Sequence, residues 1–201
     1  MDIKYYDLLS TTIIGVTIVA IFNYLFFENI EIDGVVYLAL GYLAGYFINA
    51  IGSLLEGFYY KTIKGMPSDV FLTLVKDQNW TGCKRIRFYE TERVIEILKK
   101  DLNDPKASSK KMFGCAMRKV NSCENSRVPV FNAQYAWSRS ILTTMLIVGL
   151  GCAFRFYNEW IFWPVIIILL IISWNRFKER AYYYAREVLN EYLKQADNAG
   201  R

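Results

Sequence analysis

The chain has 201 residues, of which 54% are hydrophobic and 21% are charged, and its net charge is +5. This composition is too apolar for an ordinary soluble domain and too charged for a chain that lies wholly in a membrane. We therefore expect membrane helices joined to a modest aqueous part, with the positive charge on cytoplasmic loops.

The residue inventory gives little support to catalysis. The sequence has no histidine, which excludes the nucleophile pairs and metallopeptidase motifs that need this side chain. No glycine-rich phosphate loop occurs, and Cys83, Cys115, Cys123 and Cys152 form no CxxC pair. A zinc site on the first three cysteines would need a fourth ligand. We expect a protein that is not an enzyme, with no cofactor and no metal.

Two uncharged stretches near the start of the chain, residues 8–27 and 34–55, predict a pair of membrane spans. At about 1.5 Å per residue each can cross a hydrocarbon core of about 30 Å. The six residues ENIEID between them allow only a tight connection, so residues 1–57 form a transmembrane hairpin. A cleaved signal peptide is a poor alternative, because no small-residue cleavage pattern follows the first stretch.

A second transmembrane hairpin is predicted over residues 137–176, with spans at about 138–156 and 159–176. The uncharged parts of this pair are shorter, but Arg155 can extend to the membrane surface. Aromatic side chains mark the two interfaces, as is typical of membrane helices: Tyr157, Trp160 and Trp163 on one side, Trp137 and Trp174 on the other. The alternative is a buried hairpin of a soluble protein.

Charge counts predict the orientation. Residues 56–139 carry 16 Lys and Arg against 9 Asp and Glu, whereas the charged residues of the connection 28–33 are all acidic. The positive-inside rule then places both termini and residues 58–136 in the cytoplasm of a cell with an inner membrane. The predicted fold is all-α: a polytopic membrane protein with four transmembrane helices in two hairpins and a small helical cytoplasmic domain.

The cytoplasmic part reads as amphipathic helices. Helices are expected from Ser68 to Gln78, over residues 90–104, and more weakly over 108–123. Residues 177–201 form a tail helix that packs with residues 58–136 or with the same tail in a neighbouring subunit. The proposed interface uses residues at helical spacing: Tyr184, Val188, Leu189 and Tyr192.

A polar stripe ends the second span at NAIGSLLE, residues 49–56. Small and polar residues favour close helix contact within lipid, and the candidates for helix packing or for lining a pore are Gly41, Gly45, Asn49, Gly52, Ser53 and Glu56. The stripe either bonds to a neighbouring helix at the membrane edge or lines a path through a homo-oligomer. Because Arg139 enters the third span at the same depth, we predict a Glu56–Arg139 ion pair.

The cytoplasmic side also carries a basic patch of Lys84, Arg85, Arg87, Lys106, Lys110 and Lys111. We favour a solvated face of the positive-inside kind. Contact with anionic lipid remains open, and nucleic acid is a possible but not a favoured partner.

Three short stretches carry a family resemblance: NAIGSLLE, FNAQYAWSRS before the third span, and RAYYYAREVLNEYL after the fourth. The chain resembles small multi-span membrane proteins of prokaryotic antiviral defence, such as the membrane subunit of the Kiwa system and the membrane accessory proteins of type VI-B CRISPR systems. The resemblance implies an inner-membrane homo-oligomer that responds to phage infection with a cytosolic protein partner encoded nearby. It carries over no catalytic residue.

The leading hypothesis is a membrane effector or sensor that assembles through the glycine face of the second span and the tail helices. A cytoplasmic cue would rearrange the helices that continue into the membrane, and so perturb or permeabilise the bilayer. The main alternative is a membrane-anchored scaffold that recruits a cytosolic defence enzyme or nucleoprotein and conducts nothing. A lipid-modifying enzyme ranks third, because Glu56 lacks a second acidic partner.

Overall fold

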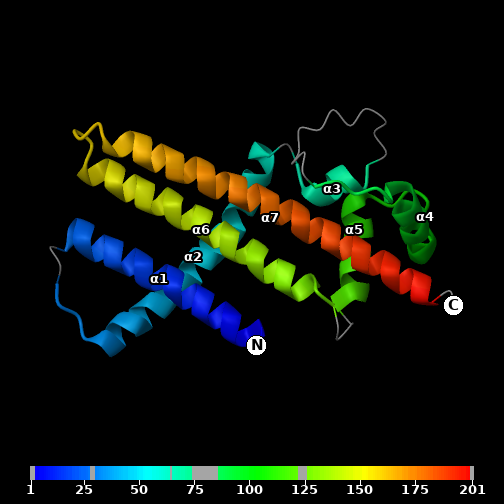
Figure 1. Ribbon diagram of the computed structural model, residues 1–201, viewed down its shortest axis with the longest axis horizontal. Helices are drawn as coiled ribbons and strands as arrows, with labels where there is room; N and C mark the ends of the chain where they lie inside the picture. The colour runs from blue at the N-terminus through cyan, green and yellow to red at the C-terminus, as the bar shows by residue number, and fades with distance from the viewer. Residues whose placement is uncertain (1–2, 28–29, 64, 74–85, 122–125, 200–201) are drawn as a thin grey trace. The chain divides into compact units, whose positions relative to one another are not determined.

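The computed structural model describes residues 3–27, 30–63, 65–73, 86–121 and 126–199, with side chains from residue 10 onward. No strand occurs in these ranges, in agreement with the predicted all-α class. The helices of Figure 1 are α1 (Ile3–Phe26), α2 (Gly34–Thr62), α3 (Pro67–Phe71), α4 (Thr91–Leu102), α5 (Ser109–Asn121), α6 (Val128–Arg155) and α7 (Phe162–Ala199).

The chain forms two compact units, and each is built from two separate parts of the sequence. Unit 1 consists of Met1–Gly57 and Ala133–Phe177, and unit 2 consists of Phe58–Asn132 and Lys178–Arg201. The predicted boundaries after residues 136 and 176 fall after residues 132 and 177 instead. Helices α2, α6 and α7 contribute residues to both units.

Two helices among the described residues, α2 and α6, are long and apolar enough to cross a membrane. The other two predicted spans do not meet this criterion. The apolar part of α1 with described side chains, Ser10–Phe26, is shorter. The first 18 residues of α7 already include Arg176, Lys178 and Glu179, because this helix continues from its apolar part straight into the charged tail.

Glycines bring α1 and α2 into backbone contact in unit 1. A Cβ atom added to Gly15 would collide with the carbonyl oxygen of Gly41, and one added to Gly45 would collide with the carbonyl oxygen of Thr11. The glycines therefore remove the side-chain layer that normally separates two helices. Beside this contact, Ile14 and Ile18 of α1 and Ile48 of α2 form a buried apolar cluster, to which α6 adds Ile141, Ile147 and Val148.

The second helical pair of unit 1 consists of α6 and the first half of α7, which lie side by side in Figure 1. Their connection is closed by Phe156 and Phe162, whose rings stack with centroids 4.5 Å apart. Gly149 on α6 leaves room for Ile166 on α7, whose Cγ2 atom would be 3.2 Å from an added Cβ. At the other end of the pair, Tyr135 contacts Phe177 with ring centroids 5.7 Å apart.

The connection between α1 and α2 supplies its own hydrogen bonds. The Asn23 amide donates to the Ile30 carbonyl at 3.0 Å and accepts from the Ile30 amide at 3.2 Å. Asp33 caps α2 by accepting from the Val35 amide at 2.9 Å, as acidic residues commonly do at a helix start. These hydrogen bonds satisfy polar groups at both ends of the connection between α1 and α2, which cross one another in Figure 1.

Unit 2 packs α3, α4, α5 and the second half of α7 around one apolar core. Phe71 of α3 meets the edge of Tyr182 on α7, with ring centroids 5.6 Å apart. The amphipathic pattern predicted for α4 is confirmed, because the apolar stripe of this helix is buried. The apolar stripe of α5 is buried as well. The core residues of these two helices are Val94, Ile95, Leu98, Met112, Ala116 and Val120.

Helix ends in unit 2 follow the local sequence. Asn103 ends α4 in the left-handed conformation (φ 48°), which asparagine tolerates well, and Pro105 follows two residues later. Ser108 accepts from the Lys111 amide at 3.4 Å at the start of α5. The helix expected from Ser68 to Gln78 is shorter, because α3 ends at Phe71 with Leu72 as its C-cap and Thr73 is not helical. Residues 74–85 lie outside the described ranges.

Replacing Gly45 by valine should destabilise unit 1, because the new side chain would force the backbones of α1 and α2 apart. Overpacking of this kind costs about 2 kcal/mol, so we expect the melting temperature of the detergent-purified protein to fall by about 5 °C. Gly57→Ala is the matched control, since nothing lies within 4 Å of a Cβ at that position of the same helix. Equal melting temperatures for the Gly45 variant and the wild type would contradict the close α1–α2 contact.

Candidate functional site

The guanidinium group of Arg139 is the centre of a polar cluster in unit 1. This side chain is only 11% exposed, although it belongs to a helix that is apolar enough to cross a membrane. Its Nη1 atom donates to Glu56 Oε2 at 2.5 Å, and its Nη2 atom donates to Asn49 Oδ1 at 3.0 Å. One side chain of α6 thus holds two residues of α2, and we call this three-residue arrangement the Arg139 clasp.

The clasp includes the ion pair expected from the sequence. Arginine suits this position, because its planar group presents several donors in fixed directions and stays charged at any physiological pH. Charge-assisted hydrogen bonds are stronger than neutral ones, and in an apolar setting their loss is correspondingly costly. The Tyr135 ring adds a cation–π contact, with the guanidinium carbon 5.7 Å from the ring centroid.

Gly52 makes the clasp possible by letting α6 approach α2. A Cβ atom at this position would lie 2.9 Å from the Thr143 hydroxyl and 3.5 Å from Arg139 Cγ. The neighbouring hydroxyls of α6 are buried but satisfied by their own helix: Thr143 donates to the Arg139 carbonyl and Thr144 to the Ser140 carbonyl, both at 2.9 Å. The Nε atom of Arg139 is buried and has no hydrogen-bond partner among the described residues.

The predicted polar stripe is only partly the one that the structure assembles. At about 100° per residue, Gly52 and Glu56 lie about 60° and 20° to one side of Asn49, whereas Ser53 lies about 40° to the other. Accordingly Ser53 is exposed, and it makes no contact in the clasp. The residues of α2 that face Arg139 are Asn49, Gly52 and Glu56.

The other predicted glycines serve a different contact. Gly41 and Gly45 face α1 of the same chain, where Gly15 completes the close approach. The expected assembly of subunits through this glycine face therefore has to be corrected, because α1 already covers it. Sequence reasoning did not single out Gly15, although it is the only glycine of α1 and the small residue Thr11 lies four positions before it.

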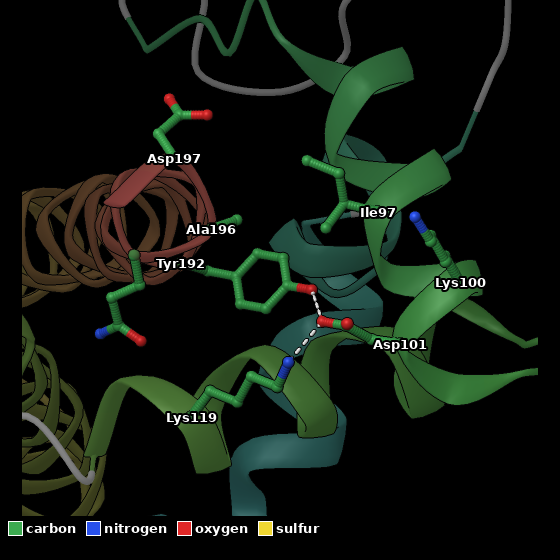
Figure 2. A pocket seen from close by; sticks show the side chains of 8 residues that line it. Ile97, Lys100, Asp101, Lys119, Tyr192, Ala196 and Asp197 are labelled. Atoms are coloured by element: carbon green, nitrogen blue, oxygen red, sulfur yellow. Dashed lines mark hydrogen bonds and ion pairs between the residues drawn. The ribbon is translucent and has the colours of Figure 1, made fainter. Parts of the chain in front are cut away.

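The predicted tail interface lies within one chain. Tyr184 donates to the sulfur of Met117 on α5 at 3.5 Å, and Val188 and Leu189 are fully buried. The Tyr192 hydroxyl donates to Asp101 Oδ2 on α4, and the same oxygen accepts from Lys119 on α5 at 2.6 Å (Figure 2). Burial and the Asp101 carboxylate both raise the pKa of Tyr192, so this hydroxyl remains a donor.

The structure describes four of the six residues of the predicted basic patch. Lys84 and Arg85 lie outside the described ranges, and Lys111 forms an ion pair with Asp104 at 2.9 Å. The remaining members, Arg87, Lys106 and Lys110, are exposed. Within the described ranges no three Cys, Asp or Glu side chains come together as metal ligands, and Cys115 and Cys152 are free thiols.

The sequence matches no family model, and no curated protein or solved structure is similar to it. The site therefore has to be interpreted from its own geometry.

Removing Glu56 should cost more than removing the whole charge pair. Glu56→Leu leaves the buried Arg139 cation without its counter-charge, which we expect to lower stability by about 3 kcal/mol. The double variant Glu56→Leu with Arg139→Met removes both charges and should recover most of the melting temperature. Ser53→Ala on the exposed side of α2 is the control and should match the wild type. A double variant that is less stable than Glu56→Leu would show that the clasp is not a charge-paired unit.

Asp101 should make unit 2 sensitive to acid. Burial raises the pKa of Asp101, but the hydrogen bonds from Lys119 and Tyr192 and the charges of Lys119 and Lys100 together lower it below its ordinary value of 3.8. A carboxyl with a lower pKa in the folded state contributes stability that is full above the unfolded-state value and is lost as the pH falls through the folded-state value. We expect the melting temperature of the wild type to fall more steeply than that of Asp101→Asn below about pH 5. Parallel pH curves would contradict this role of Asp101.

Proposed function

We propose that the chain is a four-span inner-membrane effector or sensor of prokaryotic antiviral defence, with unit 2 and both termini in the cytoplasm. In the resting state the Arg139 clasp holds α6 against α2, and a cytoplasmic cue that rearranges unit 2 releases it. The released helices then perturb or permeabilise the bilayer. The clasp is the observation that carries the proposal, since a cation paired inside an apolar helix bundle is typical of a functional element of a membrane protein.

Membrane insertion of all four segments is supported by the apolar surface that unit 1 leaves exposed. The apolar half of α7 exposes a row of large aliphatic side chains, Val165, Ile167, Ile168, Leu169, Ile171 and Ile172, each at least 44% exposed. In α2 only 17% of the most apolar stretch is buried. Such continuous apolar surface is unfavourable in water and favourable in lipid. The remaining lipid-facing length of α1 and α7 would be supplied by their flanking aromatic residues.

Continuity of the helices supports signal transmission. Arg139 lies on α6, whose first residues belong to unit 2, and α7 passes from unit 1 into unit 2 without a break. Within unit 2, Arg127 at the start of α6 approaches Glu187 of α7 at 4.0 Å. A rigid element that belongs to two units can convert a change in one into strain on the other.

A membrane-anchored scaffold is the second candidate, and a specific observation favours it. Asn49 and Glu56 are both held by Arg139 of the same chain, and Gly41 and Gly45 are covered by α1. Because the polar groups of this stripe are hydrogen-bonded within one chain, few of them are available to line a path through an oligomer. In that case unit 2 would hold a cytosolic defence protein at the membrane, and the clasp would have a purely structural role.

Membrane potential distinguishes the two candidates. We would express the protein with its genomic neighbours and follow a potential-sensitive dye before and after phage infection. The effector predicts depolarisation of wild-type cells only on infection, whereas Glu56→Gln should depolarise them without phage, because it weakens the clasp. Ser53→Ala is the control, and immunoblots of membrane fractions would verify equal insertion. A steady potential together with intact phage resistance would contradict the effector and leave the scaffold.

A further inference from the structure

The middle of α2, residues 39–51, has two exposed surfaces of different chemistry. At about 100° per residue, its exposed residues fall into two neighbouring strips, each about 80° wide. Large apolar side chains form the first, which we call the apolar strip: Leu40, Leu43, Phe47 and Ile51. The other, which we call the tyrosine strip, consists of small and hydroxyl-bearing residues: Ala39, Tyr42, Tyr46 and Ala50. Residues of the two strips alternate along the helix, so the strips differ in direction and not in depth within a membrane.

The two strips call for different surroundings. Both point away from the side of α2 on which Gly41, Gly45 and Gly52 face α1 and α6. Lipid suits the apolar strip, because acyl chains and large apolar side chains pack together without any loss of hydrogen bonds. The tyrosine strip instead presents small residues, which are typical of contacts between membrane helices, together with two polar groups.

The two tyrosine hydroxyls show what this strip lacks. Tyr42 is 45% exposed and Tyr46 is 61% exposed, and neither hydroxyl is hydrogen-bonded to a described residue. Within the uncharged stretch of residues 34–55, Tyr42 lies about 12 Å from one end and Tyr46 about 14 Å from the other. A tyrosine side chain is shorter than these distances, so in a membrane-spanning α2 both hydroxyls lie among acyl chains. A hydroxyl without a partner is unfavourable there.

We propose that the tyrosine strip is a dimer interface, at which α2 packs against α2 of a second copy of the chain. The inference rests on membrane insertion of α2, which is part of the proposed function. A second copy fits because each hydroxyl both donates and accepts, so two identical strips satisfy one another. A strip of carboxylates or amines would need an unlike partner. Chains that insert in the same direction meet about a two-fold axis along the membrane normal, where each residue faces its own counterpart.

The spacing of the strip suits a pair of parallel helices. Successive members are three, four and four residues apart, which keeps them on one side of α2 over about three turns. Ala39 and Tyr46 are seven residues apart, the repeat of left-handed helix pairs that cross at about 20°. Ala39 and Ala50 let the two backbones approach at either end of the contact, and the tyrosine rings of each helix fill the space beside the small residues of the other.

Disulfide cross-linking in native membranes tests the interface. Ala39→Cys and Ala50→Cys place a thiol on the tyrosine strip, and Leu40→Cys and Ile51→Cys place one at nearly the same depth on the apolar strip. After oxidation with copper phenanthroline, we expect the first two variants to give a dimer-sized band at least ten times stronger than that of the second two. The wild type gives the background from its own four cysteines.

The contribution of the hydroxyls is measured separately in liposomes, as energy transfer between donor-labelled and acceptor-labelled chains at falling protein-to-lipid ratios. Tyr42→Phe combined with Tyr46→Phe keeps both rings and removes both hydroxyls, so it should raise the dissociation constant of the dimer about ten-fold. Tyr24→Phe, which changes an exposed tyrosine of α1, is the matched control and should dimerise as the wild type does. An unchanged dissociation constant in the double variant would contradict the pairing of the hydroxyls.

Three outcomes would overturn the interface itself. The first is equal cross-linking on both strips, which would indicate random collision in the membrane. The second is no band above the background together with a monomeric wild type in liposomes, which would assign the strip to lipid. The third is a cross-linked band of another mass in place of the dimer, which would assign the strip to a different protein. If the dimer forms while infected cells keep their potential, the interface stands and only the effector function fails.

Discussion

A permanently charged guanidinium among apolar helices is the constraint on which unit 1 depends. A guanidinium group has only donors, so the neighbours of Arg139 must supply acceptors. Glu56 and Asn49 do so from positions about two turns apart on α2, and Gly52 between them opens the space that the arginine stem needs. The register between α2 and α6 is thereby fixed by one side chain. Apolar packing alone would fix it much less sharply, since aliphatic surfaces slide past one another at little cost.

The same unit combines two kinds of helix contact. Between α1 and α2 the contact is made by backbone atoms across glycines, whereas between α2 and α6 it is polar and specific. Close backbone packing is insensitive to whether lipid or water lies outside, and a charge pair is strengthened when water is absent. Lipid around unit 1 would therefore leave the glycine contact between α1 and α2 unchanged and strengthen the polar contact between α2 and α6. Unit 2, by contrast, is held by an ordinary apolar core with charged residues at its edge.

Features that depend on residues close together in the sequence could be predicted, whereas most contacts between distant helices could not. The helices of unit 2 could be predicted because their apolar periodicity is local, and the Glu56–Arg139 pair because two charges at the same depth in apolar segments have few other solutions. Ser53, named as a candidate for helix packing or for lining a pore, takes no part in the clasp. A stripe about 60° wide cannot be resolved further without knowing where the partner helix lies. Thr11 and Gly15 are small residues four positions apart, but this local spacing does not say which helix they face. The contacts of Asp101 were equally hidden, because Asp101 and Lys119 look like ordinary solvated charges until α4, α5 and α7 meet around them.

The discontinuity of unit 2 has a consequence for how the protein is made. Helices α3, α4 and α5 are synthesised before α6, but the surface that covers their apolar side belongs to the second half of α7. Until α7 has been translated, α3, α4 and α5 can pack only on one another, and the core of unit 2 lacks the side chains that α7 contributes. This unit therefore closes only after every apolar segment of unit 1 has been synthesised. Completion of unit 2 is thereby ordered after synthesis of unit 1, and a chain arrested before α7 would present unfinished apolar surface to chaperones and proteases.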